Sequence, residues 1–105
     1  MVHVGILGLG AIGHLIAAQL WEKSGLQLHF FNRTERHNLS FKDHLGQLLD
    51  RPINCQISPA RQRLDWLFIC LKTYHYLDAA VWFQHLIGPD TRIVVLRNGF
   101  AHSTP

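Results

Sequence analysis

Four segments of the chain are rich in apolar residues over the length of a buried β-strand. They are residues 1–7, 26–31, 65–71 and 92–96. The first is almost continuously apolar, which is typical of a central parallel strand covered on both faces. A fifth strand is indicated where Ile53, Cys55 and Ile57 alternate with polar residues before Ser58 and Pro59.

Two segments between these strands carry apolar residues at helical spacing. The first predicts a helix over residues 11–23 that stops at Ser24 and Gly25, and the second predicts a helix from Tyr76 to Ile87. Strands that alternate with helices favour an α/β fold, a doubly wound parallel sheet in three layers that forms a single domain over residues 1–105. Ligands of such sheets lie at the carboxyl ends of the strands.

Residues 38–52 fit two structures. Phe41, Leu45 and Leu48 lie at helical spacing, and Ser40 with Asp43 would suit a helix N-cap pair. Gly46 interrupts this pattern, however, and residues 39–41 alternate as a strand would. The sequence therefore leaves a short helix and a hairpin open.

The size and composition of the chain indicate a folded globular domain. Hydrophobic residues make up 48% of the 105 residues and charged residues 16%. No apolar run reaches the length of about 20 residues that spans a bilayer, and no secretory signal pattern opens the chain. We therefore expect a cytoplasmic protein with no membrane partner.

The charge of the chain favours a small anionic ligand. The formal net charge is +3 and the isoelectric point is near 9.2, but the basic residues are scattered. No basic stripe interleaved with aromatic residues is present, so no nucleic-acid partner is expected. A phosphorylated small molecule is the simpler anionic partner.

The cysteines and histidines do not indicate a metal or a disulfide. Cys55 and Cys70 each lie in a strand-like stretch outside any C-x-x-C pair, so reduced, buried thiols are expected. The eight histidines show neither H-x-x-x-H nor H-E-x-x-H spacing. We therefore predict no metal site.

The most informative motif is the glycine-rich turn between the first strand and the first helix. It consists of Gly8, Leu9, Gly10, Ala11, Ile12 and Gly13, with G-x-G-x-x-G spacing. Gly8 would form the sharp turn, Gly10 would let a pyrophosphate approach the backbone, and Gly13 would let the helix pack on the strand. Because the N–H groups at the helix start favour phosphate, these six residues predict a dinucleotide-binding turn of the Rossmann type.

The residues after the second strand bear on which dinucleotide binds. Enzymes that use NAD carry an acidic residue there, which accepts hydrogen bonds from the ribose hydroxyls. This chain has Asn32 and Arg33 instead, with Arg36 close by. An arginine can grip a 2′-phosphate with two charge-assisted hydrogen bonds, so Arg33 favours NADP(H) over NAD(H).

Two further polar segments follow strands of the predicted sheet. Lys72 comes directly after the strand at 65–71, and Asn98 comes shortly after the strand at 92–96. The carboxyl ends of parallel strands lie along one edge, so these residues should lie near the glycine turn and Arg33.

Together these segments resemble a known family. The motifs GLGAIG at 8–13, NRT at 32–34, ICLKTYH at 69–75 and RNGF at 97–100 are similar to the N-terminal domain of ketopantoate reductase (2-dehydropantoate 2-reductase). The resemblance implies an oxidoreductase that reduces a small 2-keto acid, 2-dehydropantoate, with NADPH in pantothenate biosynthesis. It also implies that Lys72 contacts the cofactor and acts in catalysis, and that Asn98 positions the nicotinamide and the substrate.

The resemblance covers only the cofactor half of such an enzyme. The family's helical C-terminal domain supplies the proton donor, so we expect this chain to bind NADPH without turnover. The family also favours a hairpin at 38–52. The alternatives are the cofactor domain of another NADP-dependent 2-keto acid reductase and a stand-alone dinucleotide-binding regulatory or interaction module. Apolar surface left exposed on a lone domain would favour a homo-oligomer.

Overall fold

The apolar N-terminal run forms the middle strand of a parallel sheet. The computed structural model describes residues 1–43, 45–71 and 79–96, and its first strand is β1 (Val2–Leu7). β1 pairs in parallel with β2 (Leu26–Phe31) on one side and with β6 (Trp66–Ile69) on the other. With neighbours on both edges, β1 is buried from Val4 onward, as its continuous apolar pattern predicts.

The two outer strands complete the sheet. Within the described residues it has five strands in the order β5-β2-β1-β6-β7, all parallel, with β5 (Cys55–Gln56) and β7 (Arg92–Val95) at the edges. The strand predicted over residues 53–57 is therefore shorter than its alternation suggests. The reason is that the Ile53 N–H donates to the His37 carbonyl instead, and that Ile57 is already exposed beyond β5.

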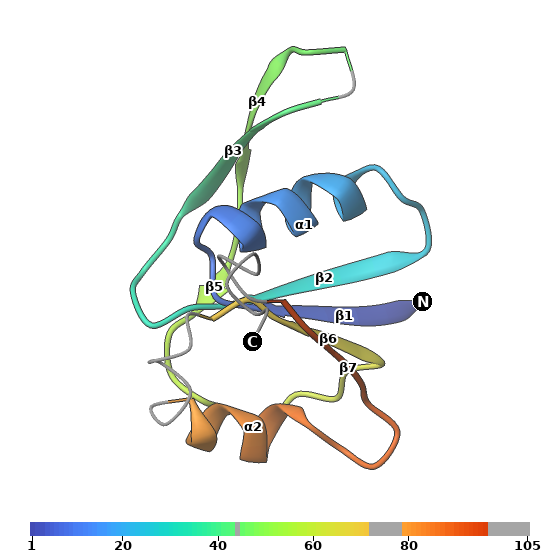
Figure 1. Ribbon diagram of the computed structural model, residues 1–105, viewed down its shortest axis with the longest axis vertical. Coiled ribbons are helices and arrows are strands. Elements are labelled where there is room, and N and C mark those ends of the chain that lie inside the picture. Colours follow the sequence, from blue (N-terminus) through green and yellow to red (C-terminus); the bar gives the residue numbers. More distant parts are fainter. Residues whose placement is uncertain (44, 72–78, 97–105) are drawn as a thin grey trace, which may run out of the picture.

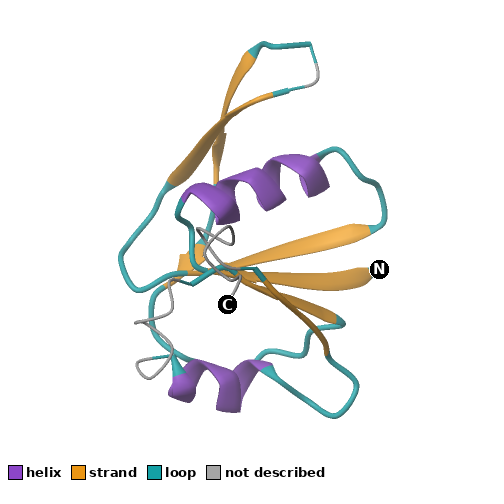
Figure 2. Cartoon of the chain, viewed as in Figure 1, coloured by secondary structure: helices purple, strands orange, loops and turns teal. Residues whose placement is uncertain are grey.

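In the described part of the chain, one helix covers each face of the sheet, as Figures 1 and 2 show. α1 (Ala11–Trp21) connects β1 to β2, and α2 (Ala80–Leu86) lies between β6 and β7 on the opposite face. The predicted three-layer, doubly wound α/β fold is thus confirmed. α1 ends two residues before its predicted end, and residues 76–78 of the second predicted helix lie outside the described residues.

Neighbouring residues of β1 point to opposite faces of the sheet, so they belong to two different hydrophobic clusters. Ile6 belongs to the cluster on the α1 side, whose fully packed members are Ile6, Leu9, Ala17, Phe30 and Leu39. Leu7 belongs to the cluster on the α2 side, where the ring of Trp82 meets the edge of Phe31 at 5.9 Å between centroids. This packing holds both helices against the carboxyl half of the sheet.

Residues 38–52 form an antiparallel hairpin, so the helix alternative is wrong. β3 (Asn38–Lys42) pairs with β4 (Leu48–Pro52), and the hairpin lies beside α1 in Figure 1. Leu39 is fully buried against that side of the fold, and the rings of Phe41 and Trp21 are 5.6 Å apart. The alternation of apolar and polar residues at 39–41 therefore predicted the strand correctly.

The two residues that suited a helix N-cap stabilise the hairpin instead. Asp43 Oδ1 accepts hydrogen bonds from the N–H groups of Leu45 and Gln47, both at 2.9 Å, and so organises the turn. Ser40 donates across the strands to Asp50. The apolar spacing was misleading because Leu45 and Leu48 are both exposed.

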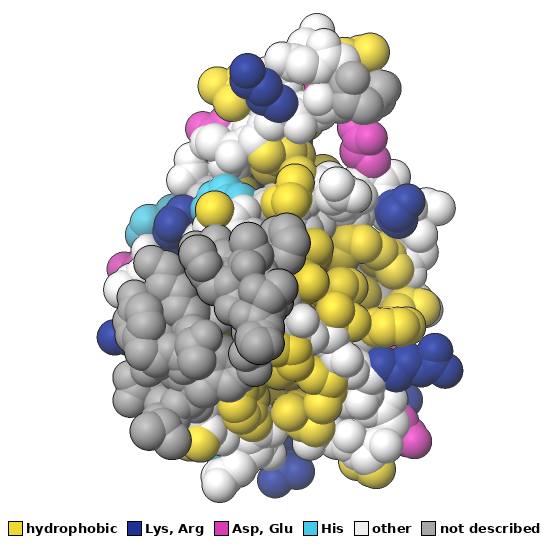
Figure 3. All heavy atoms as spheres, viewed as in Figure 1, with side chains coloured by type: hydrophobic (Ala, Val, Ile, Leu, Met, Phe, Trp, Pro, Cys, Tyr) yellow, Lys and Arg dark blue, Asp and Glu magenta, His cyan; other side chains and the backbone are white. Residues whose placement is uncertain are grey.

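Apolar side chains remain exposed beside the sheet. Figure 3 shows hydrophobic side chains gathered between the two helices in this view. On the edge strand β7, Ile93 and Val95 are 45% and 47% exposed. No helix within the described residues has the length and apolar character needed to cross a membrane.

Candidate functional site

The glycine-rich turn connects β1 to α1, and two of its glycines are required by the fold itself. Gly8 has a φ of +98°, and a β-carbon there would lie 2.7 Å from the Cys70 carbonyl oxygen. A β-carbon on Gly13 would overlap the Gly8 carbonyl oxygen. The turn therefore closes tightly on β6 and on the first turn of the helix, in the roles that the sequence predicts for Gly8 and Gly13.

Gly10 differs, because none of the described residues occupies the space next to it. A β-carbon at Gly10 would meet no described atom within 4 Å, and the residue is exposed. Gly10 is also the N-cap of α1, where no side chain caps the helix and no acidic residue occupies the first turn. The N–H groups that start α1 have no partner within the helix, and no described side chain fills the space beside Gly10, so this helix start is suited to an anion.

Asn32 ties the glycine turn to the end of β2. Its Oδ1 accepts the Leu9 N–H at 3.1 Å, while its Nδ2 donates to the carbonyl and hydroxyl oxygens of Thr34. The Gly8 N–H donates to the Phe31 carbonyl at 2.8 Å. The N–H groups of Gly8 and Leu9 are thus already engaged, whereas those of Gly10, Ala11 and Ile12 have no partner among the described residues.

The turn and the end of β2 face one cleft of about 410 Å³. It is lined by Gly8, Leu9, Gly10, Asn32, Arg33, Thr34, Arg36, Cys70 and Leu71. The prediction that Arg33 lies near the glycine turn is therefore confirmed. Lys72 and Asn98, predicted to join them, lie outside the described residues.

The cleft contains two arginines that carry no carboxylate partner. Among the described residues, the ion pair within 4.0 Å joins Glu35 to His37, and neither Arg33 nor Arg36 has an acidic neighbour at that range. Arg33 is exposed and Arg36 half-buried. Two guanidinium groups without a carboxylate partner in the described part of the chain make the cleft attractive to a phosphate.

His14 is a site residue that the sequence did not single out. Its Nδ1 lies 3.0 Å from the Gly10 carbonyl oxygen, and its Nε2 lies 3.4 Å from Arg36 Nη1. The signal available was only that His14 directly follows the last glycine of the motif. Its contact with Arg36 joins residues that are 22 positions apart, which no local pattern encodes.

Cys70 borders the cleft but does not add a charge to it. Burial raises the pKa of the Cys70 thiol to about 11, so the thiol is neutral at physiological pH. Cys70 and Cys55 are both free cysteines, as predicted, but both are half-buried rather than buried. A neutral thiol does not repel a phosphate, and it is a poor nucleophile.

The histidine pair on the sheet lies apart from this cleft. His3 on β1 and His29 on β2 stack at 5.2 Å between ring centroids, with Nδ1 of His3 2.9 Å from Nε2 of His29. Burial and then the neighbouring His3 lower the pKa of His29. His29 is therefore neutral at neutral pH, and the pair is a hydrogen-bonded part of the packing of the sheet.

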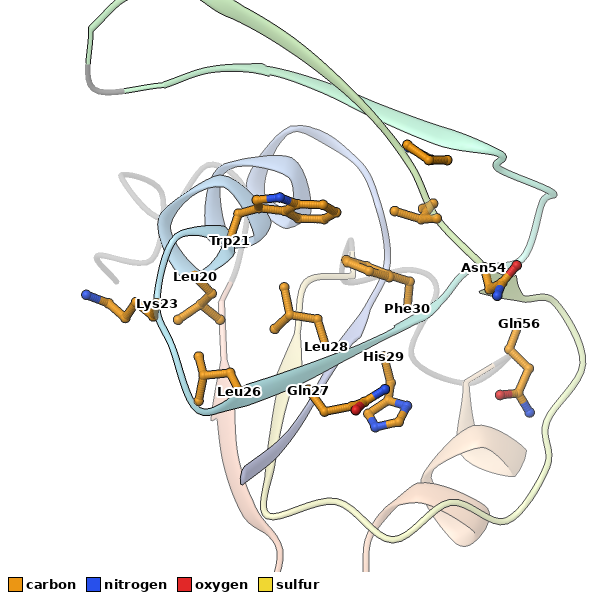
Figure 4. A pocket seen from close by; sticks show the side chains of 12 residues that line it. Leu20, Trp21, Lys23, Leu26, Gln27, Leu28, His29, Phe30, Asn54 and Gln56 are labelled. Carbon is orange, nitrogen blue, oxygen red and sulfur yellow. The ribbon is translucent and has the colours of Figure 1, made fainter. Parts of the chain in front are cut away.

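A second hollow, of about 490 Å³, lies along the edge of β2 near the end of α1. Figure 4 shows Leu20, Trp21, Leu28 and Phe30 on the α1 side of this hollow, whereas His29 points to the other side of the strand. It contains neither the glycine turn nor the uncapped start of α1. Although it is the larger of the two, it lacks the donors that a dinucleotide requires.

The parallel sheet, the glycine turn at its carboxyl edge and the cleft beside it define a Rossmann-type α/β domain. A family model described as "Ketopantoate reductase PanE/ApbA" matches residues 4–105. The chain belongs to the ketopantoate reductase family, whose members use a nicotinamide dinucleotide.

Individual relatives agree with this assignment. The 2-dehydropantoate 2-reductase of Caulobacter vibrioides is 30% identical over 105 residues, which is all of this chain and 36% of that protein. Among solved structures, the 2-dehydropantoate 2-reductase of Methylococcus capsulatus superposes with a TM-score of 0.72 at 23% identity. A dimeric ketopantoate reductase of Staphylococcus aureus gives a TM-score of 0.69 at 21% identity. Each alignment covers 93% of this chain and 34% of the solved one, so the chain spans about a third of these relatives.

Proposed function

We propose that this chain is the NADP(H)-binding half of a 2-dehydropantoate 2-reductase, an oxidoreductase of pantothenate biosynthesis. The observation that carries the proposal is the pair Arg33 and Arg36 beside the glycine turn, in a cleft whose described lining contains no carboxylate. An acidic residue at that place would accept the ribose hydroxyls of NAD and repel a 2′-phosphate. The family assignment supports the reaction, and the arginines support the phosphorylated cofactor.

The described residues fit NADP(H) in distinct roles. The N–H groups from Gly10 to Ile12 would hold the pyrophosphate, and Arg33 would hold the 2′-phosphate. Gly8, Leu9 and Gly13 would act by shaping the turn, because their own groups are packed or engaged within the protein. By the resemblance to the family, Lys72 would contact the cofactor, and Asn98 would position both nicotinamide and substrate.

The reduction of a 2-keto acid requires more than this half provides. When bound, NADPH supplies the hydride that goes to the keto carbon. The reaction also needs a proton donor for the new alkoxide and an anchor for the substrate carboxylate. We propose that a helical substrate domain, separate from residues 1–105, supplies the proton donor and most substrate contacts.

The cofactor preference can be measured by titrating the chain with NADPH and NADH. We expect NADPH to bind at least about tenfold more tightly, because a charge-assisted contact to the 2′-phosphate contributes one to a few kcal/mol. Arg33→Ala should remove most of this preference while leaving NADH affinity unchanged. Arg51→Ala, an exposed arginine on β4, is the matched control. Equal affinity of the parent chain for both cofactors would contradict the assignment to NADP(H).

If residues 1–105 bind the cofactor and a separate domain supplies the proton donor, this chain should bind NADPH without catalysing the reduction. Mixed with NADPH and 2-dehydropantoate, the 105-residue chain is expected to show no loss of absorbance at 340 nm above the rate without protein. NADPH fluorescence in the same sample should still report binding. Oxidation of NADPH that depends on 2-dehydropantoate would show that these residues suffice for the reaction.

The exposed apolar residues of β7 fit the same proposal. Ile93 and Val95 lie on an edge strand whose far side has no partner strand within the described residues. We propose that they are covered in a full-length enzyme or in a homo-oligomer, since such an edge is costly to leave in water.

A further inference from the structure

His14 joins the glycine turn to Arg36 through the two nitrogens of one imidazole. Nδ1 lies 3.0 Å from the Gly10 carbonyl oxygen, which can only accept, so Nδ1 carries the proton. Nε2 lies 3.4 Å from Arg36 Nη1, which can only donate, so Nε2 must present its lone pair. The two partners thus select a single neutral tautomer of His14, in which the ring bridges α1 and the segment after β2.

Arg36 also lies near Cys55 on β5, since it partly offsets the rise that burial causes in the pKa of the Cys55 thiol. The Arg36 guanidinium is contacted by His14 of α1. The side chain lines the same cleft as Gly10 and Arg33. The segment between Asn32 and β3 therefore presents two arginines, of which only Arg36 is held by a side chain of α1.

We propose that His14 is a positioning residue that holds the Arg36 guanidinium in the cleft, where Arg36 acts with Arg33 as a second ligand of the cofactor's 2′-phosphate. This inference rests on the proposed NADP(H) function and extends it to two residues outside the glycine motif and the predicted Arg33 contact.

The chemistry of the contact explains why an imidazole suits this place. A carboxylate would hold Arg36 more strongly, but it would neutralise the guanidinium and repel the incoming phosphate. A neutral imidazole orients the arginine with one acceptor and leaves its positive charge available. The remaining N–H groups of the guanidinium, which is a planar fork, can then face a phosphate. Because His14 also bonds to the Gly10 carbonyl, it links the two parts of the cleft that would hold phosphates.

Three variants test the proposal by their ratio of NADPH affinity to NADH affinity. His14→Leu keeps the bulk of the side chain and removes both hydrogen bonds, and it should lower NADPH affinity about fivefold with NADH affinity unchanged. Arg36→Ala should have a similar or larger effect. In the double variant the two losses should not add, because both act through one guanidinium. His14→Gln, whose side chain offers an NH2 donor group and a carbonyl acceptor, should restore most of the preference.

Other outcomes would overturn the proposal in distinguishable ways. If His14→Leu weakens NADPH and NADH equally, His14 only supports the helix start. If Arg33→Ala abolishes the preference whereas the His14 and Arg36 variants keep it, the proposed function stands and this inference fails. Additive losses in the double variant would show that the two residues act separately. If the parent chain has no preference for NADPH, both proposals fail together.

Discussion

Replacing Gly13 with alanine is expected to destabilise the fold by about 3 kcal/mol or more. The added β-carbon would overlap the Gly8 carbonyl oxygen, which is a backbone atom and cannot rotate away. Gly8 is itself confined, since its N–H donates to the Phe31 carbonyl and it packs against the Cys70 carbonyl. Urea unfolding followed by tryptophan fluorescence measures the loss as a lower midpoint with an unchanged slope.

Gly10→Ala provides the matched control in the same turn. Its φ of −77° suits any residue, and the new β-carbon would meet no described atom within 4 Å. Alanine is a somewhat poorer N-cap than glycine, so a cost below about 1 kcal/mol is expected. If the Gly10 and Gly13 variants unfolded at the same urea concentration, the close contact between Gly13 and Gly8 would not govern the turn.

The same Gly10→Ala variant is expected to lose dinucleotide affinity by about 100-fold or more, although it folds. The β-carbon would stand in the space that the pyrophosphate needs to reach the N–H groups at the start of α1. Both NADPH and NADH should be affected, because the pyrophosphate is common to them. Titration followed by NADPH fluorescence, with calorimetry for NADH, measures both affinities.

Gly88→Ala is the corresponding control for binding. Gly88 lies in the turn before β7, and its β-carbon would be in ordinary contact, 3.6 Å from the Thr91 hydroxyl. This variant should bind both cofactors as the parent does. If Gly10→Ala bound them equally well, the pyrophosphate could not lie over Gly10, and the cleft assignment would have to be revised.

Features that depend on residues near one another in the chain could be predicted from the sequence. β2 has the predicted bounds, and the glycine spacing predicted both the turn and the separate roles of Gly8 and Gly13. Such patterns are readable because strand alternation, helical spacing and the geometry of glycine act over a few residues.

Residues 38–52 and the strand at 53–57 show where local patterns fail. Leu45 and Leu48 fit a helix by spacing, yet packing of Leu39 and Phe41 beside α1 selects the hairpin. β5 is reduced to Cys55–Gln56 because the Ile53 N–H donates to the carbonyl of His37, the residue before β3. In both places a contact with a distant element outweighs the local preference.

By itself, the sequence determined the class of fold, the glycine turn and the arginine after β2, because each is written in consecutive residues. Only the tertiary structure decided that Asn32 engages the Leu9 N–H, that no described residue fills the space over Gly10, and that His14 contacts Arg36. These features join residues about 20 positions apart or depend on empty volume. Their energies are set by atoms that the fold brings together, and no sequence spacing encodes that arrangement.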